Sequence, residues 1–185
     1  MILTDREIQV ALATGQIKVS PKPAADAYSS SSLDLTLGST LRIWKVESQG
    51  VEGVLNPGVP GFKALSVIDE MTDSKRIGTN GYIIEPGSFF LAWTAERVDI
   101  PVKSRLAARV EGKSSLARLG VGVHVTAPTI HAGFRGPIQL EVCNQGPLRV
   151  RVVPGMKVCQ LIFEQTLGTP VKGYEGQFLG QTRTR

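Results

Sequence analysis

The segment EGKSSLARLG, residues 111–120, concentrates the side chains of this chain that are best suited to hold an anion. Lys113, Ser114, Ser115 and Arg118 lie close together in it, and a glycine stands on either side of them. Serine hydroxyls and lysine ammonium groups bind phosphate oxygens, and an arginine guanidinium grips an oxyanion through two parallel hydrogen bonds. We call residues 113–118 the cradle. The pattern predicts a site for a phosphorylated ligand, although it lacks the spacing of a P-loop.

A single carboxylate follows further along, inside an otherwise apolar run. Residues 137–142 read PIQLEV, so Ile138 and Leu140 share one face of the expected strand and Gln139 and Glu141 share the other. From this pattern alone, a glutamate that points to solvent or pairs with an arginine is favoured. The alternative is a carboxyl group in a partly dry pocket, where it can accept and deliver protons.

Composition indicates one ordinary globular domain over residues 1–185, with 42% hydrophobic and 20% charged residues. No apolar run has the length of a membrane span, and the N-terminus lacks the pattern of a signal peptide. Cys143 and Cys159 lie in apolar runs, which is typical of buried free thiols. We therefore expect a cytoplasmic protein with no membrane partner.

The net charge of +5 raises the question of nucleic-acid binding. The lysines and arginines are scattered, however, and the aromatic content of 6% offers few platforms on which bases stack. The charge suits an enzyme for polyanionic small molecules equally well. We expect no nucleic-acid partner.

Periodicity indicates a mainly β protein with one short helix at the start. Thr4 and Glu7 have the spacing of a capping box, and Gly15 is a plausible stop for the helix that follows. Apolar and polar residues alternate near residues 33–37, 121–125, 138–142 and 148–152, and apolar runs cover 89–93 and 156–163. Short strands with 20 glycines and 11 prolines favour an antiparallel sandwich or barrel. Residues 47–81 form an irregular excursion with one structured piece around 64–71.

These motifs together resemble the dCTP deaminase family, within the dUTPase-like superfamily. The resemblance rests first on EGKSSLARLG and on HVTAPTIHAGFRGPIQLE, which ends at Glu141. SSLDLTLG near the start, EPG in the middle, PGM with QL, and YEGQFLGQ near the end also match, in the order of the family. The resemblance therefore spans nearly the whole chain.

The resemblance implies a dUTPase-like fold, a distorted jelly roll or sandwich-like β barrel, which assembles as a homotrimer. It implies hydrolytic deamination of dCTP to dUTP and ammonia, with Glu141 as general acid/base and with Arg118 and Ser114 orienting the water. Mg²⁺ is expected on the substrate triphosphate, and dTTP is a candidate feedback inhibitor. Zinc deaminases carry H-x-E followed by P-C-x-x-C. Neither His124 nor His131 begins such a motif, so we expect no zinc and no metal at the base.

The resemblance also implies a substrate-binding set. In it the cradle holds the triphosphate, the residues near 127 and 139–140 contact base and sugar, and the tail from 174 to 185 closes as a flexible lid. The set comprises Lys113, Ser114, Ser115, Leu116, Ala117, Arg118, Ala127, His131, Gln139, Leu140, Tyr174, Gln177 and Gln181. Gln177 stands where the family usually has a lysine, and Arg183 and Arg185 are candidates to replace that charge. A plain disordered terminus is the alternative to a lid.

His131 is a second departure, because the family usually places an aspartate there. A neutral imidazole still hydrogen-bonds a sugar hydroxyl but carries no fixed negative charge. We interpret this change as favouring deamination over hydrolysis at the phosphate. A dUTP diphosphatase or a bifunctional enzyme giving dUMP stays open, as does a non-catalytic nucleotide-sensing regulator. His124 is predicted to be structural or to lie on the rim.

Overall fold

The computed structural model describes residues 1–45 and 54–176. Three α-helices, two short 3-10 helices and twelve strands make up the described chain. Their bounds are α1 Asp5–Ala13, β1 Lys18–Ser20, η1 Ala25–Ala27, β2 Tyr28–Ser29, β3 Ser32–Trp44, α2 Ala64–Met71, β4 Thr72–Arg76, β5 Tyr82–Ile84, β6 Phe89–Asp99, η2 Val102–Ser104, β7 Leu106–Gly112, α3 Ser114–Ala117, β8 Val121–Val123, β9 Thr129–Ile130, β10 Arg135–Asn144, β11 Val150–Val152 and β12 Lys157–Gln165. The mainly β fold with a short N-terminal helix is confirmed.

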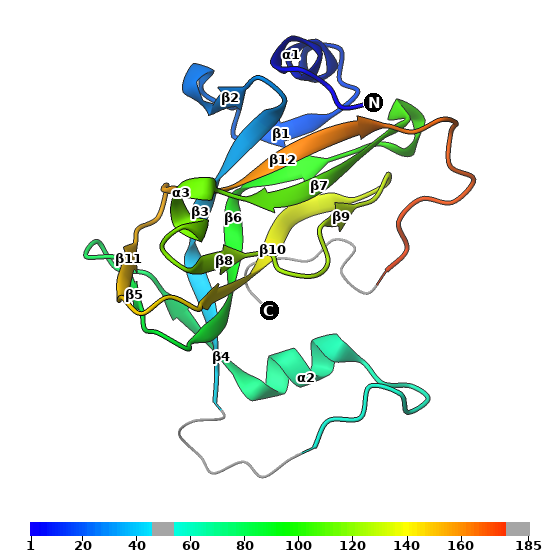
Figure 1. Ribbon diagram of the computed structural model, residues 1–185. Helices are drawn as coiled ribbons and strands as arrows, with labels where there is room; N and C mark the ends of the chain where they lie inside the picture. The colour runs from blue at the N-terminus through cyan, green and yellow to red at the C-terminus, as the bar shows by residue number, and fades with distance from the viewer. Residues whose placement is uncertain (46–53, 177–185) are drawn as a thin grey trace.

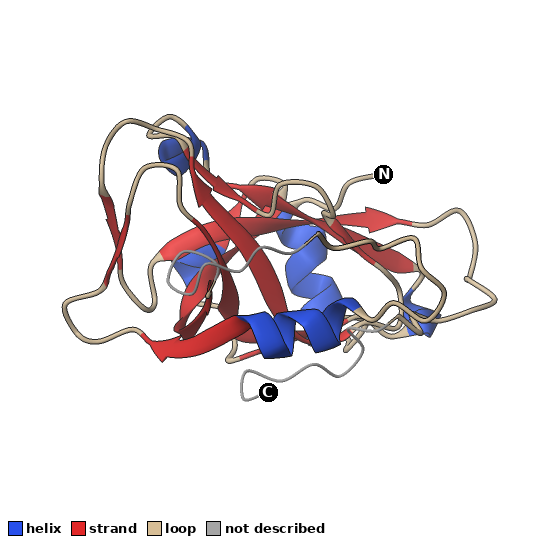
Figure 2. Cartoon of the chain, turned by 90° about the horizontal axis from the view of Figure 1, so that it is seen from below, coloured by secondary structure: helices blue, strands red, loops and turns tan. Residues whose placement is uncertain are grey.

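One curled antiparallel sheet forms the body of the molecule, in the order β8-β10-β6-β3-β12-β7-β9 (Figure 1). Strand β1 pairs with β6, β2 and β4 pair with β3, and β5 and β11 form a separate two-stranded sheet. Strands dominate the view from below, where α2 lies in front of the sheet (Figure 2). Because β3 pairs with both β6 and β12, it joins the two halves of the curled sheet.

The core lies on the inner side of this sheet and follows the predicted alternation. Ile138, Leu140 and Val142 of β10 are all buried, as are Leu33 and Leu35 of β3. The expectation that β3 is half-buried is wrong, because Asp34 on its other side is only 7% exposed. Its carboxylate pairs with Lys113 at 2.5 Å, so an ion pair fills the face that the alternation assigned to solvent.

The N-terminal helix begins where the sequence predicts, but the Thr4 hydroxyl half of its capping box does not form. The Thr4 hydroxyl donates to the carboxylate of Glu7 and makes no bond to a backbone amide. That hydrogen bond is the main cause of a lowered pKa of Glu7. Ile8 and Ala11 are buried against the sheet, and the helix ends just before Gly15. Burial of one apolar stripe therefore holds α1, as is usual for short helices.

The expected excursion contains more regular structure than its sequence indicates. The piece predicted around residues 64–71 is α2, Ala64–Met71. Strand β4 was missed, although it pairs with β3 over its full length. Its sequence, TDSKR, shows no alternation because all but its first residue are exposed. The hydrogen bonds of its backbone, rather than burial of its side chains, keep it in the sheet.

Just after the cradle, the backbone at Gly120 passes very close to the backbone at Gly146. We call this close approach the crossing. Gly120, directly after α3, has φ +86°, and a Cβ added there would lie 2.3 Å from the Cα of Gly146. The Gln145 amide also donates to the Gly120 carbonyl at 2.8 Å. Only glycine fits both the left-handed backbone and the crowding. The crossing therefore ties the end of the cradle to the turn after β10.

Replacing Gly120 tests this crossing. We expect Gly120→Ala to lower the free energy of unfolding by about 3 kcal/mol or more, from left-handed strain plus overpacking against backbone. The matched control is Gly155→Ala, since Gly155 has φ +81° with no atom within 4 Å of the added Cβ. The control should lose about 1–2 kcal/mol from strain alone. Urea unfolding at equal protein concentration measures both, and equal losses would show that the crossing is not tight.

Candidate active site

Glu141 stands on the outer face of β10, at the edge of a cavity of about 380 Å³. In the sheet register it lies opposite Leu91 of β6. The cavity is lined by Ile68, Leu91, His124, Ala127, Thr129, Ile130, His131, Phe134, Ile138, Gln139, Glu141 and Tyr174. Apolar side chains make most of its wall, and the side chain of Glu141 is 32% exposed. The alternative interpretation of Glu141, a carboxyl group in a partly dry pocket, agrees with this geometry.

His124 is the closest ionisable neighbour of Glu141. It follows β8, where its backbone N–H donates to the Glu141 carbonyl at 2.7 Å. Its φ of 62° is unusual for a residue other than glycine and turns the side chain back toward β10. Nδ1 of the ring then lies 3.0 Å from Oε2 of Glu141, and the His124 side chain is only 6% exposed. The sequence-based assignment of His124 to a structural or rim position missed this contact.

The other ring nitrogen of His124 determines where protons can lie. Nε2 is 2.7 Å from the carbonyl oxygen of Ala127, which only accepts, so Nε2 carries a hydrogen. In a neutral imidazole Nδ1 is then bare and faces the carboxylate as a second acceptor. Nδ1 and Oε2 are both buried and have no other hydrogen-bond partner among the described residues. Their close approach is favourable only when the pair holds one proton, either on the ring or on the carboxyl group.

The last described residues of the chain pack against the rim of the cavity. The Tyr174 amide donates to the Ala132 carbonyl at 2.9 Å, and the Tyr174 ring stacks on His131 with centroids 5.8 Å apart. Gly133 permits this approach, because a Cβ there would lie 2.7 Å from the Tyr174 nitrogen. Tyr174 and His131, two members of the expected substrate-binding set, thus lie together at the rim. Gln177, Gln181, Arg183 and Arg185 lie outside the described residues, as does most of the predicted lid.

The cradle does not line this cavity. Its helical turn is α3, and Ser114, Ser115, Ala117 and Arg118 are exposed. In the described part of the chain, the side chains of Ser114, Ser115 and Arg118 make no hydrogen bond or ion pair. Lys113 instead pairs with Asp34 at 2.5 Å. One chain therefore holds the exposed cradle apart from the cavity that Glu141 lines, and we call these two places the half-sites.

Two predicted contact residues turn their side chains away from both half-sites. Leu140 is fully buried and Leu116 is 4% exposed, and both belong to the hydrophobic core. Only their backbone groups are available to a ligand. Ala127 and Gln139, by contrast, line the cavity with Glu141.

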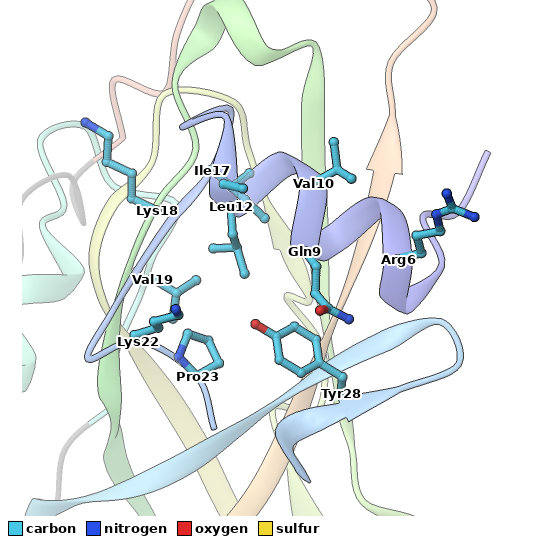
Figure 3. Close-up of a pocket in the computed structure, with 11 residues that line it drawn as sticks. Arg6, Gln9, Val10, Leu12, Ile17, Lys18, Val19, Lys22, Pro23 and Tyr28 are labelled. Carbon is cyan, nitrogen blue, oxygen red and sulfur yellow. The ribbon is translucent and has the colours of Figure 1, made fainter. Parts of the chain in front are cut away.

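A larger hollow of about 710 Å³ lies beside α1 and is lined by Arg6, Lys18, Lys22 and Tyr28 among others (Figure 3). It contains neither a carboxylate nor a histidine, so it offers no group for proton transfer near neutral pH. Among residues 1–45 and 54–176, no three His, Cys, Asp or Glu side chains gather as a metal site requires. No helix of the described chain is long and apolar enough to span a membrane.

The two free cysteines differ in burial. Cys159 is buried, as expected, and burial raises the pKa of its thiol, whereas Cys143 is only partly buried.

Ile68 and Leu91 of the cavity were not predicted. Leu91 lies in a predicted apolar strand, but its place opposite Glu141 depends on the pairing of β6 with β10. Ile68 comes from α2, and nothing in its local sequence indicates which part of the sheet it reaches.

Comparison with known proteins identifies the family. A family model described as dCTP deaminase-like matches residues 2–166. The chain is 37% identical over 175 residues to a dCTP deaminase of Rhodospirillum rubrum, covering 94% of this chain and 87% of that protein. It is 35% identical over 186 residues to a "dCTP deaminase, dUMP-forming" of Methanosphaera stadtmanae, covering 98% and 90%.

Solved structures with a similar fold include 2′-deoxycytidine 5′-triphosphate deaminase from Agrobacterium tumefaciens. It matches with a TM-score of 0.66 at 25% identity over 88% of this chain, which spans 47% of the length of that protein. A dUTPase of Staphylococcus bacteriophage 80alpha matches with a TM-score of 0.50 at 11% identity, over 86% of this chain and 96% of that one. The second likeness concerns the fold alone, and it confirms the expected dUTPase-like architecture.

Removal of the His124 ring should destabilise the protein. We expect His124→Ala to lower the free energy of unfolding by about 2 kcal/mol, because Glu141 Oε2 and the Ala127 carbonyl lose their partner. His131→Ala is the control, since His131 is exposed and only stacks on Tyr174. It should cost no more than about 1 kcal/mol. Chemical denaturation measures both variants, and an equal loss would contradict a special role for the His124 contacts.

Proposed function

This chain belongs to the dCTP deaminase-like family, and we propose that it is a dCTP deaminase that converts dCTP and water to dUTP and ammonia. The observation that carries the proposal is the Glu141 carboxyl group in a mostly apolar cavity, 3.0 Å from a ring nitrogen of His124. Deamination of cytosine needs one group that accepts a proton from water and then delivers it. Glu141 is the group in this cavity whose chemistry fits that task.

The reaction uses the carboxylate as a relay for two protons in turn. Glu141 takes a proton from water while the water oxygen bonds to C4 of the base, and that proton goes to N3. The carboxylate then moves the remaining hydroxyl proton to the amino group. The C4–N bond breaks, ammonia leaves, and C4 keeps a carbonyl oxygen, which is the base of dUTP. His124 positions the carboxylate and stabilises its charge when the ring carries the shared proton.

The cradle completes the site from a second copy of the chain. Ser114, Ser115 and Arg118 are exposed and free of partners in the described chain, yet they do not line the cavity with Glu141. A homotrimer in which the cradle of one copy faces the cavity of the next would join the two half-sites. Serine, lysine and arginine then bind the triphosphate of Mg–dCTP, and Arg118 with Ser114 orients the water.

A dUMP-forming enzyme is the second candidate. It is favoured by the likeness to relatives named "dCTP deaminase, dUMP-forming", from Methanosphaera stadtmanae and Methanobrevibacter smithii at 35% and 37% identity. His131 argues for the simpler reaction, because it supplies no fixed negative charge beside the sugar and phosphates. Identification of the product decides between them: dUTP from a deaminase alone, and dUMP with pyrophosphate from a bifunctional enzyme.

Neutralising Glu141 tests the proposed chemistry. We expect Glu141→Gln to lower ammonia release from dCTP by about 10³-fold, because an amide cannot accept the proton of water. Binding of Mg–dCTP, measured by calorimetry, should survive. Glu85→Gln is the matched control, since Glu85 pairs with Arg149 on the surface away from the cavity. Turnover retained by the Glu141 variant would remove this residue from the role of acid/base.

Mixed trimers test whether two copies share each site. Glu141→Gln and Arg118→Ala should each be inactive alone. In trimers assembled from an equal mixture, about one quarter of the sites receive an intact Glu141 from one copy and an intact Arg118 from the next, so about a quarter of wild-type activity should return. Co-expression with two affinity tags yields such trimers. If a single chain held the whole site, mixing would restore nothing.

A further inference from the structure

Helix α2 is apolar in sequence but is not held by the core. It reads ALSVIDEM, and none of its side chains is buried. It lies at the opposite end of the molecule from α1 (Figure 1). A helix of eight residues is marginal in water without further contacts. Something other than core packing must fix its position.

Arg42 of β3 supplies that fixation at the C-terminal end of the helix. Its side chain donates to Asp69 Oδ1 at 2.7 Å, to the Ile68 carbonyl at 3.2 Å and to the Thr72 hydroxyl at 2.8 Å. Arg42 is only 6% exposed. A buried guanidinium is costly unless its donors are satisfied, so loss of these contacts would leave an uncompensated charge. We call these three contacts of Arg42 the clamp, and they resist displacement of α2.

Lys45, also on the β3 side, extends the clamp. Its backbone amide donates to the Met71 carbonyl at 3.0 Å and its ammonium group to the Glu70 carbonyl at 2.9 Å. These carbonyls belong to the last turn, where a helix has no internal donors and where cations are favourable. The sheet thus caps α2 instead of burying it.

The clamped turn also forms part of the cavity. Ile68, whose carbonyl accepts from Arg42, lines the cavity together with Glu141 and Leu91. Arg42 lies opposite Leu91, and Leu91 lies opposite Glu141, so the three side chains form a row on one face of the sheet. Arg42, which fixes α2, therefore lies in the same row of side chains as Glu141.

We propose that Ile68 is a specificity-determining residue that packs against the pyrimidine base, and that Arg42 is the positioning residue that holds it there. The inference rests on the proposed function, because it names a wall of the same site. An apolar wall gives the flat base a surface to pack on and excludes water from the reaction at C4. It places α2, rather than the cradle or the tail, beside the base.

The first test truncates the wall. Ile68→Ala should lower kcat/KM for dCTP about tenfold, which is the usual effect of removing apolar contacts in a substrate pocket. Leu65→Ala is the control, because Leu65 is a half-buried apolar residue of the same helix that does not line the cavity. It should stay within about twofold of wild type. Equal effects of the two variants would overturn the role of Ile68.

The second test weakens the contact between Arg42 and α2 while keeping the arginine itself. Asp69→Asn weakens the contact to Arg42. Glu70→Gln is the matched control, because it also removes one negative charge from this turn but leaves the ion pair of Arg42 with Asp69 intact. We expect Asp69→Asn to lower kcat/KM about fivefold in the wild-type background and less than twofold in the Ile68→Ala background, because coupled residues are not additive. Glu70→Gln should change little in either.

A loss from Asp69→Asn that is the same in both backgrounds would overturn the positioning role of Arg42, since a merely structural effect adds independently. Melting temperatures of all variants are measured alongside. Deaminase activity of the wild-type protein is measured first. Its absence would refute the proposed function itself, whereas an active wild type with equal Ile68 and Leu65 variants refutes only this inference.

Discussion

The candidate site depends on the close contact between the Glu141 carboxyl group and the His124 ring. Oε2 of Glu141 and Nδ1 of His124 lie 3.0 Å apart, and the far side of the ring is fixed by its bond to the Ala127 carbonyl. The backbone bond from His124 to Glu141 places both residues at the same level of the sheet. The ring cannot rotate to offer its other nitrogen without breaking the bond to Ala127. The carboxyl group is therefore oriented before any substrate arrives, as electrostatic preorganisation requires.

A charged contact to the sheet also helps to hold each of two helices near the half-sites, and α2 has no buried side chain besides. The cradle is anchored where Lys113 meets Asp34, which is 7% exposed, and α2 is anchored by Arg42. Breaking a buried ion pair by removing one partner typically costs about 3–5 kcal/mol, although the intact pair adds little net stability. Such contacts specify position more than they stabilise the fold. This suits short elements that must present a free surface to a ligand.

The sequence predicted the elements well and their meeting points poorly. Alternating residues indicated β10 and β3, and the structured piece expected around 64–71 appeared as α2. Glu141 was singled out by the family resemblance, whereas the local pattern alone favoured a glutamate that points to solvent. His124 was not singled out, because its role follows from the pairing of β8 with β10 and from a left-handed backbone. Ile68 and Arg42 were missed for the same reason, since long-range register is not written in local periodicity.

The separation of cradle and cavity has an energetic consequence beyond geometry. Arg118 is exposed without a partner in the described chain, and each chain carries a net charge of +5, so bringing several copies together costs electrostatic repulsion. A triphosphate bound between two copies neutralises part of that charge at the interface itself. Any ligand that binds only the assembled state stabilises that state by mass action. In the proposed trimer, substrate binding and subunit association would therefore reinforce each other through the same arginine and lysine side chains.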